Sequence, residues 1–270
     1  MPTKKKSNLI IPVKSCTIKI LPSSLWMKAA AKAVEVNPIN APAVQQFKRL
    51  LPSAVLPPQH IAAMTTKYWK TGKVNLTVGF LDNPPADLQK RILSHMNAWS
   101  KFGNVNFVIS KTDPQVRIAR VDKGDQAGYW SYLGTDILSI KPGKPTMNLD
   151  SFTMQTQDSE FHRVVRHETG HTLGFPHEHM RKEIVNRIDP AKAKAYFLRE
   201  DGWDAQEVQD QVLTPLDNSA LIKTEKPDDR SIMCYWLPAE IMKDNVAVPG
   251  GTDIDKQDGQ FAGMLYPKKV

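Results

Sequence analysis

Residues 167 to 179 read HETGHTLGFPHEH, and this stretch constrains the fold more than any other part of the chain. It holds four of the 7 histidines found in 270 residues. His167 and His171 are four residues apart, so on a helix their imidazoles lie on one face, one turn apart. That spacing lets both rings reach one metal ion at about 2.0–2.1 Å. The stretch therefore predicts a helix that presents two ligands to a metal.

The residues around this pair extend the pattern to a third ligand. Gly174 permits a left-handed turn that ends the helix, so the returning chain can bring His177 to the same metal. Three neutral imidazoles leave one position open for water, which is typical of a catalytic rather than a structural zinc site. Glu168 lies one step round the helix and is expected to reach a metal-bound water. His179 is an alternative ligand, whereas His162 lies off the ligand face.

Hydrophobic periodicity predicts mixed α and β structure around this helix. Alternating residues predict strands at 73–81, 104–110 and 115–121, with shorter strand candidates at 135–140 and 146–150. An amphipathic helix is expected over 85–103, with one apolar face made of Leu88, Ile92, Met96 and Trp99. The active-site helix should run over 158–174, starting at an Asp158 or Ser159 cap. Further helices are expected at 189–200, 204–213 and 255–266.

The first 60 residues differ in composition from the rest. They contain nine basic residues and one acid, no glycine and eight of the 20 prolines, so the net charge of +8 belongs to them. We expect residues 1–60 to form a separate basic segment, with a helix at 23–36 begun by a serine and a linker at 51–60. Residues 61–270 should form the main domain. The segment lacks interleaved aromatic residues, which favours a solvated tail or surface wrap over nucleic-acid binding.

Several classes of protein are disfavoured by what the sequence lacks. It has no apolar run of 18 residues, so no membrane span is expected, and the run LIIPV is too short for a signal peptide. Cys16 and Cys234 are too few for a disulfide framework, and we expect two free thiols. These observations leave the location of the protein open and predict no membrane partner.

With these motifs in view, the sequence resembles the metzincin metallopeptidases, and within them the astacin family of peptidases. Met233 in SIMCYW matches the methionine turn, and Tyr235 follows it as in astacins. Glu178 follows the third histidine, GYWSYLG (128–134) resembles an astacin motif, and DIDKQDGQFAGMLYP resembles the last helix. The resemblance covers about residues 65–267. It implies an α+β, zincin-like fold, with a twisted and mostly parallel sheet, an active-site helix and a helical or irregular C-terminal lobe.

The resemblance implies a zinc-dependent metalloendopeptidase that hydrolyses protein or peptide substrates through a zinc-bound water. One catalytic Zn²⁺ is expected on the three histidines, with Glu168 as general base. Tyr235 is expected to stabilise the oxyanion, and Met233 to form an apolar floor under the metal. The strand at 146–150 resembles the sheet edge that pairs with substrate. A monomer is favoured, and secretion is suggested by the resemblance alone.

The chain departs from the family pattern in ways that concern regulation. Tyr129 stands where the family motif has a cysteine, so we expect a disulfide-free member. By resemblance, residues 1–60 would be a propeptide and Glu178 would receive the new N-terminus after cleavage. Cys16 would then supply a thiolate to the zinc and hold the enzyme latent, or it is simply a small buried side chain. A non-catalytic zinc-binding interaction protein is the alternative function, although such a protein needs neither Glu168 nor Tyr235.

Overall fold

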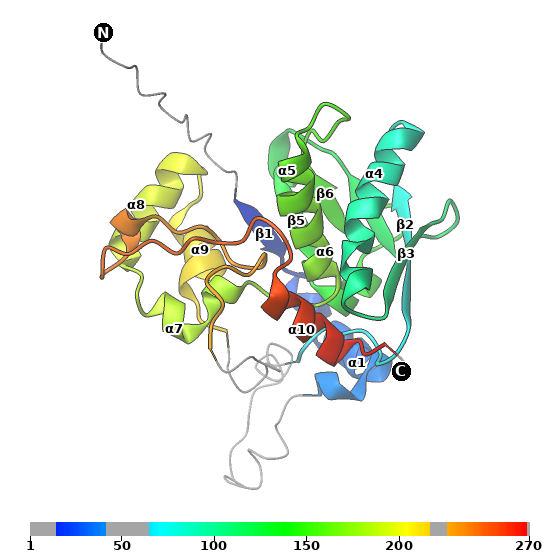
Figure 1. The fold of residues 1–270 in the computed structure, drawn as a ribbon, viewed down its shortest axis with the longest axis horizontal. Helices are drawn as coiled ribbons and strands as arrows, with labels where there is room; N and C mark the ends of the chain where they lie inside the picture. The colour runs from blue at the N-terminus through cyan, green and yellow to red at the C-terminus, as the bar shows by residue number, and fades with distance from the viewer. Residues whose placement is uncertain (1–14, 42–64, 217–225, 269–270) are drawn as a thin grey trace, which may run out of the picture.

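The computed structural model describes residues 15–41, 65–216 and 226–268, and its two lobes lie side by side in Figure 1. The first lobe is built on a sheet, and the second is made of short helices and irregular chain. The expected α+β, zincin-like architecture is confirmed. The linker expected at 51–60 lies outside the described residues.

The sheet has six strands in the order β1-β5-β6-β4-β2-β3. Neighbouring strands run parallel, except that β5 is antiparallel to β6. The strands expected at 73–81, 104–110, 115–121 and 146–150 are present, and two further strands join them at one side. The strands are β1 (Cys16–Lys19), β2 (Val74–Phe80), β3 (Val105–Ile109), β4 (Val116–Ala119), β5 (Tyr129–Tyr132) and β6 (Met147–Leu149).

The order of the strands corrects one expectation about the sheet edge. β6, which lies within 146–150, has strands on both sides and cannot receive a further strand. Among the described strands, its neighbour β5 is covered only by β1, which pairs with it in parallel over four residues from Cys16↔Tyr129 to Lys19↔Tyr132. The strand next to the edge is therefore β5, and the N-terminal segment forms the edge itself.

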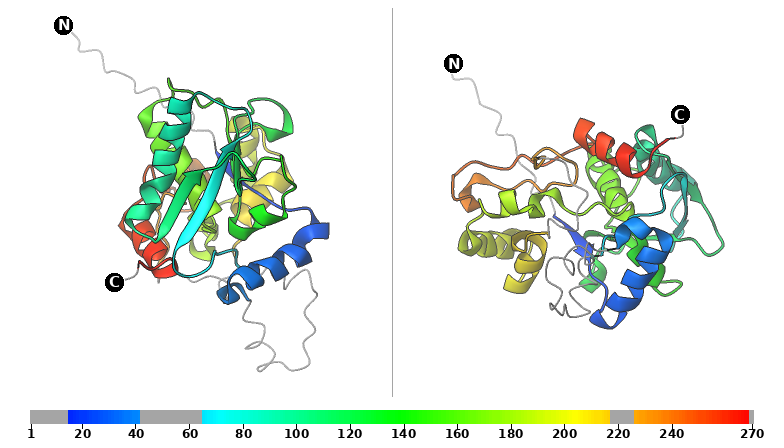
Figure 2. Two further views of the ribbon diagram at one scale, coloured as in Figure 1. Left: turned by 90° about the vertical axis from the view of Figure 1, so that its right-hand side faces the viewer. Right: turned by 90° about the horizontal axis from the view of Figure 1, so that it is seen from below.

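The helices of the first lobe follow the predicted periodicity. α4 (Ala86–Met96) runs beside the active-site helix in front of the sheet (Figure 1) and continues as the 3₁₀ turn η3 (Asn97–Lys101). The four residues expected on its apolar face are all buried at 1% exposure or less. α1 (Trp26–Val36) packs on η5 (Gly134–Ser139) beneath the sheet (Figure 2).

One predicted element type and one predicted helix start are wrong for local reasons. Residues 135–140 alternate like a strand, but most of them belong to the 3₁₀ helix η5. The turn at Gly134 explains this, because its φ is +46° and an added Cβ would clash with the Lys67 carbonyl oxygen. The helix at 23–36 begins with a 3₁₀ turn, η1 (Ser23–Leu25), whose cap position is Pro22, so no serine caps it.

The active-site helix is a single run of three parts, α5 (Asp158–Glu160), the π-helical η6 (Phe161–Val165) and α6 (Arg166–Thr172). Its cap position is Gln157, so the expected Asp158 or Ser159 cap is wrong. Gly174 ends the run as predicted, with φ of +95°. A π-helical turn widens the helix and often accompanies a functional site.

The second lobe has its own apolar core, separate from the core under the sheet. Cys16 of β1 belongs to this second core, so the N-terminal segment contacts both lobes. α10 lies across the front of the molecule and packs on η3 of the first lobe (Figure 1). The helices after the active-site helix are α7 (Lys182–Val185), α8 (Pro190–Glu200), α9 (Ala205–Val208) and α10 (Lys256–Leu265). The remaining short turns are η2 (Pro38–Asn40), η4 (Gly124–Gln126), η7 (Glu178–Met180), the π-helical η8 (Gln209–Leu213) and η9 (Ala239–Ile241).

Over residues 15–41, 65–216 and 226–268, no helix combines the length and the apolar character needed to cross a bilayer.

Candidate active site

The three histidines predicted as ligands meet at one point between the lobes. His167 and His171 come from α6, and His177 comes from the chain that returns after Gly174. The Nε2 atom of His177 lies 3.3 Å from that of His167 and 3.0 Å from that of His171. Ligands at 2.0–2.1 Å from one tetrahedral metal stand about 3.3 Å apart. The spacing of the nitrogens therefore fits a zinc ion.

Hydrogen bonds to the backbone fix two of these rings with their Nε2 lone pairs facing inward. His167 Nδ1 donates to the Ile232 carbonyl oxygen at 2.6 Å, and His171 Nδ1 donates to that of Phe175 at 2.8 Å. A carbonyl only accepts, so in both rings Nδ1 carries the proton. Such outer partners orient metal-binding histidines and raise their basicity.

Burial keeps the three imidazoles neutral, which is the form that binds metal. Their exposed fractions are 4% or less. Burial lowers the pKa of His167 to about 4. It also lowers the pKa of His171 and of His177, and the neighbouring imidazoles lower these two further. All three rings are available as ligands at neutral pH.

Glu168 lies beside the histidines in the same enclosed volume. Its side chain is fully buried, and within the described chain no N–H or O–H group donates to either carboxylate oxygen. Burial raises its pKa well above the usual range, while the Cys16 thiol and Arg163 act in the opposite direction. A buried carboxylate that receives no N–H or O–H hydrogen bond is costly in a purely structural role, so this side chain is suited to exchanging protons.

Met233 packs directly against the active-site helix. A Cβ added at Gly170 would clash with Met233 Sδ and lie 3.3 Å from Trp99, so only glycine leaves room there. The turn that carries Met233 is held by Asp258 of α10, which accepts hydrogen bonds from Ser231 Oγ at 2.5 Å and Ile232 N at 2.9 Å. These contacts hold the methionine against the active-site helix.

Tyr235 and His179 form a stacked pair next to His177. Their ring centroids are 3.9 Å apart, and the Tyr235 ring is 4.4 Å from that of His177. The Tyr235 hydroxyl is buried and has no hydrogen-bond partner in the described residues. His179 Nε2 donates to the Gln211 carbonyl oxygen at 2.9 Å, so this ring faces away from the group of three. His179 is therefore a packing residue in the second lobe.

Glu178 and Cys16 have different partners near the centre. Glu178 pairs with Arg181 at 3.0 Å and accepts a hydrogen bond from Asp228 N at 3.0 Å. Cys16 Sγ lies within 4.8 Å of a ring nitrogen of His167 and a carboxylate oxygen of Glu168. Both cysteines of the chain are free and buried, and Cys234 lies in the core of the second lobe.

A pocket of about 710 Å³ opens beside the centre. His167 and Tyr235 line it together with Cys16, and acidic side chains of α8, η9 and the residue after α8, namely Glu200, Glu240 and Asp201, line its wall. The N-terminal segment thus contributes to the wall of the same pocket that reaches His167.

Sequence reasoning missed several supporting residues. The carbonyls of Ile232 and Phe175 carry no side-chain signal, because any residue could supply them. Asp258 could have been found from the capping box that it forms with Asp255 at the start of α10. The pairing of β1 with β5 had no signal, because four residues are too few for a periodicity.

A helix that carries His167, Glu168 and His171, a returning third histidine and a methionine turn define a metallopeptidase of the metzincin class. The comparisons with known proteins give the family. The sequence profile of the peptidase family described as Astacin matches residues 62–212, so the chain belongs to the astacin family. The zinc metalloproteinase nas-27 of Caenorhabditis elegans is 30% identical over 113 residues, which are 42% of this chain and 23% of that protein.

Solved structures agree with this assignment. Myroilysin has a TM-score of 0.69 and 28% identity, and the match covers 76% of this chain and 97% of that chain. High choriolytic enzyme 1, a hatching-enzyme zinc-protease of Oryzias latipes (Medaka fish), has a TM-score of 0.51 and 20% identity over 75% of this chain and 95% of that chain. The second likeness shows the fold alone.

Proposed function

We propose that this protein is a zinc-dependent endopeptidase that cuts protein or peptide substrates. The observation that carries the proposal is the meeting of three imidazole Nε2 atoms, 3.0 and 3.3 Å apart, beside a buried glutamate. Membership of the astacin family supports zinc-dependent proteolysis. The single catalytic zinc would be held by His167, His171 and His177, whose neutral rings suit it.

Bound zinc would act as a Lewis acid that makes water acidic and polarises the scissile carbonyl. Glu168 would take the proton from the attacking water and then deliver it to the leaving amine. Its burial supports this role, because a raised carboxyl pKa brings proton affinity closer to the working pH.

Tyr235 would donate its hydroxyl to the oxyanion that forms on the substrate carbonyl. In support, the hydroxyl is buried beside His177 and has no partner among the described residues. Met233 would act only as a packing support, since its sulfur contacts the helix at Gly170. Glu178 would position the returning chain, because its backbone N–H donates to the Met233 carbonyl oxygen at 2.8 Å.

We further propose that residues 1–60 keep the full chain latent, with residues 61–270 as the catalytic domain. β1 covers the β5 edge, where an extended substrate would otherwise pair through main-chain hydrogen bonds. Cys16 would serve as a fourth zinc ligand, and its support is the proximity of Sγ to His167 and Glu168. Zinc would lower the pKa of this thiol, which burial otherwise raises.

Comparing the full chain with Cys16→Ser tests latency. Cleavage that rises in Cys16→Ser, or in a chain cut near residue 62, supports it. Full activity of the uncut wild type, unchanged by Cys16→Ser, would contradict it. Cys234→Ser is the matched control, because Cys234 is also a buried free thiol but belongs to the second-lobe core.

The alternative is an interaction protein that binds zinc without cutting. It is less well supported, because such a protein has no use for a buried carboxylate beside the three imidazoles. Cleavage of a mixed peptide library by the cut chain, compared with its Glu168→Ala variant at equal zinc content, separates the two. We expect cleavage to fall by about 10²–10⁴-fold in the variant. Equal cleavage by both proteins would exclude Glu168 as the base.

A further inference from the structure

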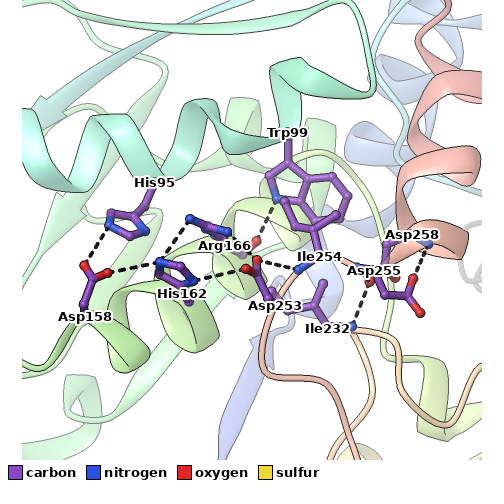
Figure 3. Close-up of polar contacts among 10 residues, drawn as sticks. All are labelled: His95, Trp99, Asp158, His162, Arg166, Ile232, Asp253, Ile254, Asp255 and Asp258. Carbon is purple, nitrogen blue, oxygen red and sulfur yellow. Dashed lines mark hydrogen bonds and ion pairs between the residues drawn. The ribbon is translucent and has the colours of Figure 1, made fainter.

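A second group of metal-ligating side chains lies outside the active site, where α4 meets the start of the active-site helix (Figure 3). It consists of His95, Asp158 and His162, whose candidate ligand atoms all lie within 4.8 Å of one another. Asp158 and His162 are four residues apart on the helical run, so they face the same side. His95 comes from α4 and completes the group from the opposite helix.

The distances in this group match those between ligands of one ion. Asp158 Oδ1 lies 3.5 Å from His95 Nε2, and its Oδ2 lies 3.2 Å from His162 Nε2. Ligands of a tetrahedral zinc ion stand about 3.3 Å apart. The group therefore places one carboxylate next to two imidazoles, with the three candidate ligand atoms within 4.8 Å of one another.

The hydrogen bonds of His162 direct its lone pair toward Asp158. Its Nδ1 lies 3.1 Å from Asp253 Oδ2, and because a carboxylate only accepts, Nδ1 is the donor. Arg166 Nη2 and Asp158 Oδ2 both approach Nε2, at 3.3 Å and 3.2 Å, so in the neutral ring with its proton on Nδ1 the lone pair of Nε2 is available to a metal. A carboxylate behind a histidine is the outer partner that metal-binding histidines commonly have.

Two acceptor atoms, His162 Nε2 and Asp158 Oδ2, thus face each other at 3.2 Å. A lone pair on Nε2 at this distance would repel the carboxylate, and either a proton on the ring or a metal ion removes that repulsion. His95 is also a neutral ring, since burial lowers its pKa to about 4, so one of its two nitrogens has a lone pair that a metal could use. Its Nδ1 has no partner in the described chain, so its polar contact with the group runs through Nε2.

The charged side chains around this group predict that a bound metal ion would exchange readily with solution. Arg91 contacts Asp158 Oδ1 at 3.1 Å and would compete with a metal, as would Arg166. Arg166 has another partner, however, because it also pairs with Asp253. The Asp158 side chain is 67% exposed, so water can complete the coordination. Imidazole ligands favour zinc, nickel or copper over magnesium or calcium, which prefer oxygen.

We infer that His95, Asp158 and His162 form a second site for a borderline divalent metal such as Zn²⁺, separate from the three active-site histidines. A bound ion would link α4 to the helical run that leads into His167. The site is open on one side, so it would fill at higher free metal than the buried centre.

Zinc content after equilibrium dialysis against buffered free zinc tests this inference on the tag-free full chain. We compare wild type, Asp158→Asn and His162→Gln, with Asp82→Asn as the matched control. Asp82 is also a partly exposed aspartate paired with an arginine, Arg120, at 2.8 Å. Metal binding at the His95 group should also raise the melting temperature of wild type and of Asp82→Asn.

We expect wild type and Asp82→Asn to bind one more zinc ion than the other two variants at micromolar free zinc. Equal zinc content and equal thermal shifts in all four proteins would overturn the site, and the contacts would then be ion pairs bridged by protons. If none of the four proteins retained the more tightly bound zinc expected at the three active-site histidines, the result would instead count against the proposed peptidase centre. The two failures are therefore distinguishable.

Discussion

The active-site helix contributes histidines to two groups that differ in their surroundings. His167 and His171 are buried, and their outer nitrogens donate to neutral backbone carbonyls. His162, one turn earlier, is partly exposed and interacts with carboxylates and a guanidinium. We expect burial and the charge of the outer partner to set how tightly each group would hold a metal. Carbonyl partners fix the ring without adding a competing cation, whereas Arg166 brings one.

The largest expected difference between the groups is in activity. Replacing His171 by alanine removes a ligand from the buried centre, so cleavage by the cut chain should fall to the level of the metal-free protein. Zinc content and peptide cleavage, measured together, check this. If His171→Ala kept both, the buried group would not be the catalytic one.

The packing behind the buried group gives a smaller, structural effect. Gly170→Ala should lower the free energy of unfolding by up to about 2 kcal/mol, because the new methyl group clashes with Met233 Sδ and lies 3.3 Å from Trp99, at a cost of about 1–3 kcal/mol. This cost exceeds the gain of about 1 kcal/mol that alanine brings to a helix. Urea unfolding measures the difference. Gly263→Ala, in α10, is the control, since its only close contact is at 3.3 Å. A stabilised Gly170→Ala protein would show that the contact with Met233 is not tight.

The carboxylates near the two groups should respond oppositely to pH. Burial raises the pKa of Asp258 from 3.8 to about 7, so the folded state binds its proton more tightly than the unfolded state. Its contribution to stability should fall as pH rises from about 4 to 7, by up to about 1.4 kcal/mol per unit. The Arg91 contact instead holds the pKa of Asp158 below its usual value. The stability that the Asp158 carboxylate contributes is therefore lost as pH falls. Stability measured against pH should become flatter in Asp258→Asn between pH 4 and 7, and an unchanged slope would contradict this.

The smallest effect is expected at His162. In metal-free protein, His162→Gln should change the free energy of unfolding by less than about 1 kcal/mol, because its contacts are partly exposed ion pairs. Thermal unfolding in the presence of a chelator measures it. A loss of several kcal/mol would show that His162 is important for folding. It would contradict the contrast between the His162 group and the buried histidines.

How far the sequence predicts this molecule depends on the range of each interaction. The helix α4 follows from the spacing of Leu88, Ile92 and Met96, and the active-site group follows from one motif in which Gly174 turns the chain. The edge strand does not follow, because the pairing of β1 with β5 joins segments more than a hundred residues apart. Nor do the 3₁₀ turn at η5 or the approach of His95 to His162, which depend on how separate elements pack.

X-ray absorption at the zinc edge, on the cut chain loaded with one equivalent of zinc, tests the central claim most directly. We predict a first shell dominated by imidazole nitrogen at about 2.0–2.1 Å, which His177→Ala would weaken and His162→Gln would leave intact. A first shell made mainly of carboxylate and water oxygen, unaffected by His177→Ala, would contradict the assignment of the catalytic zinc to the three buried histidines.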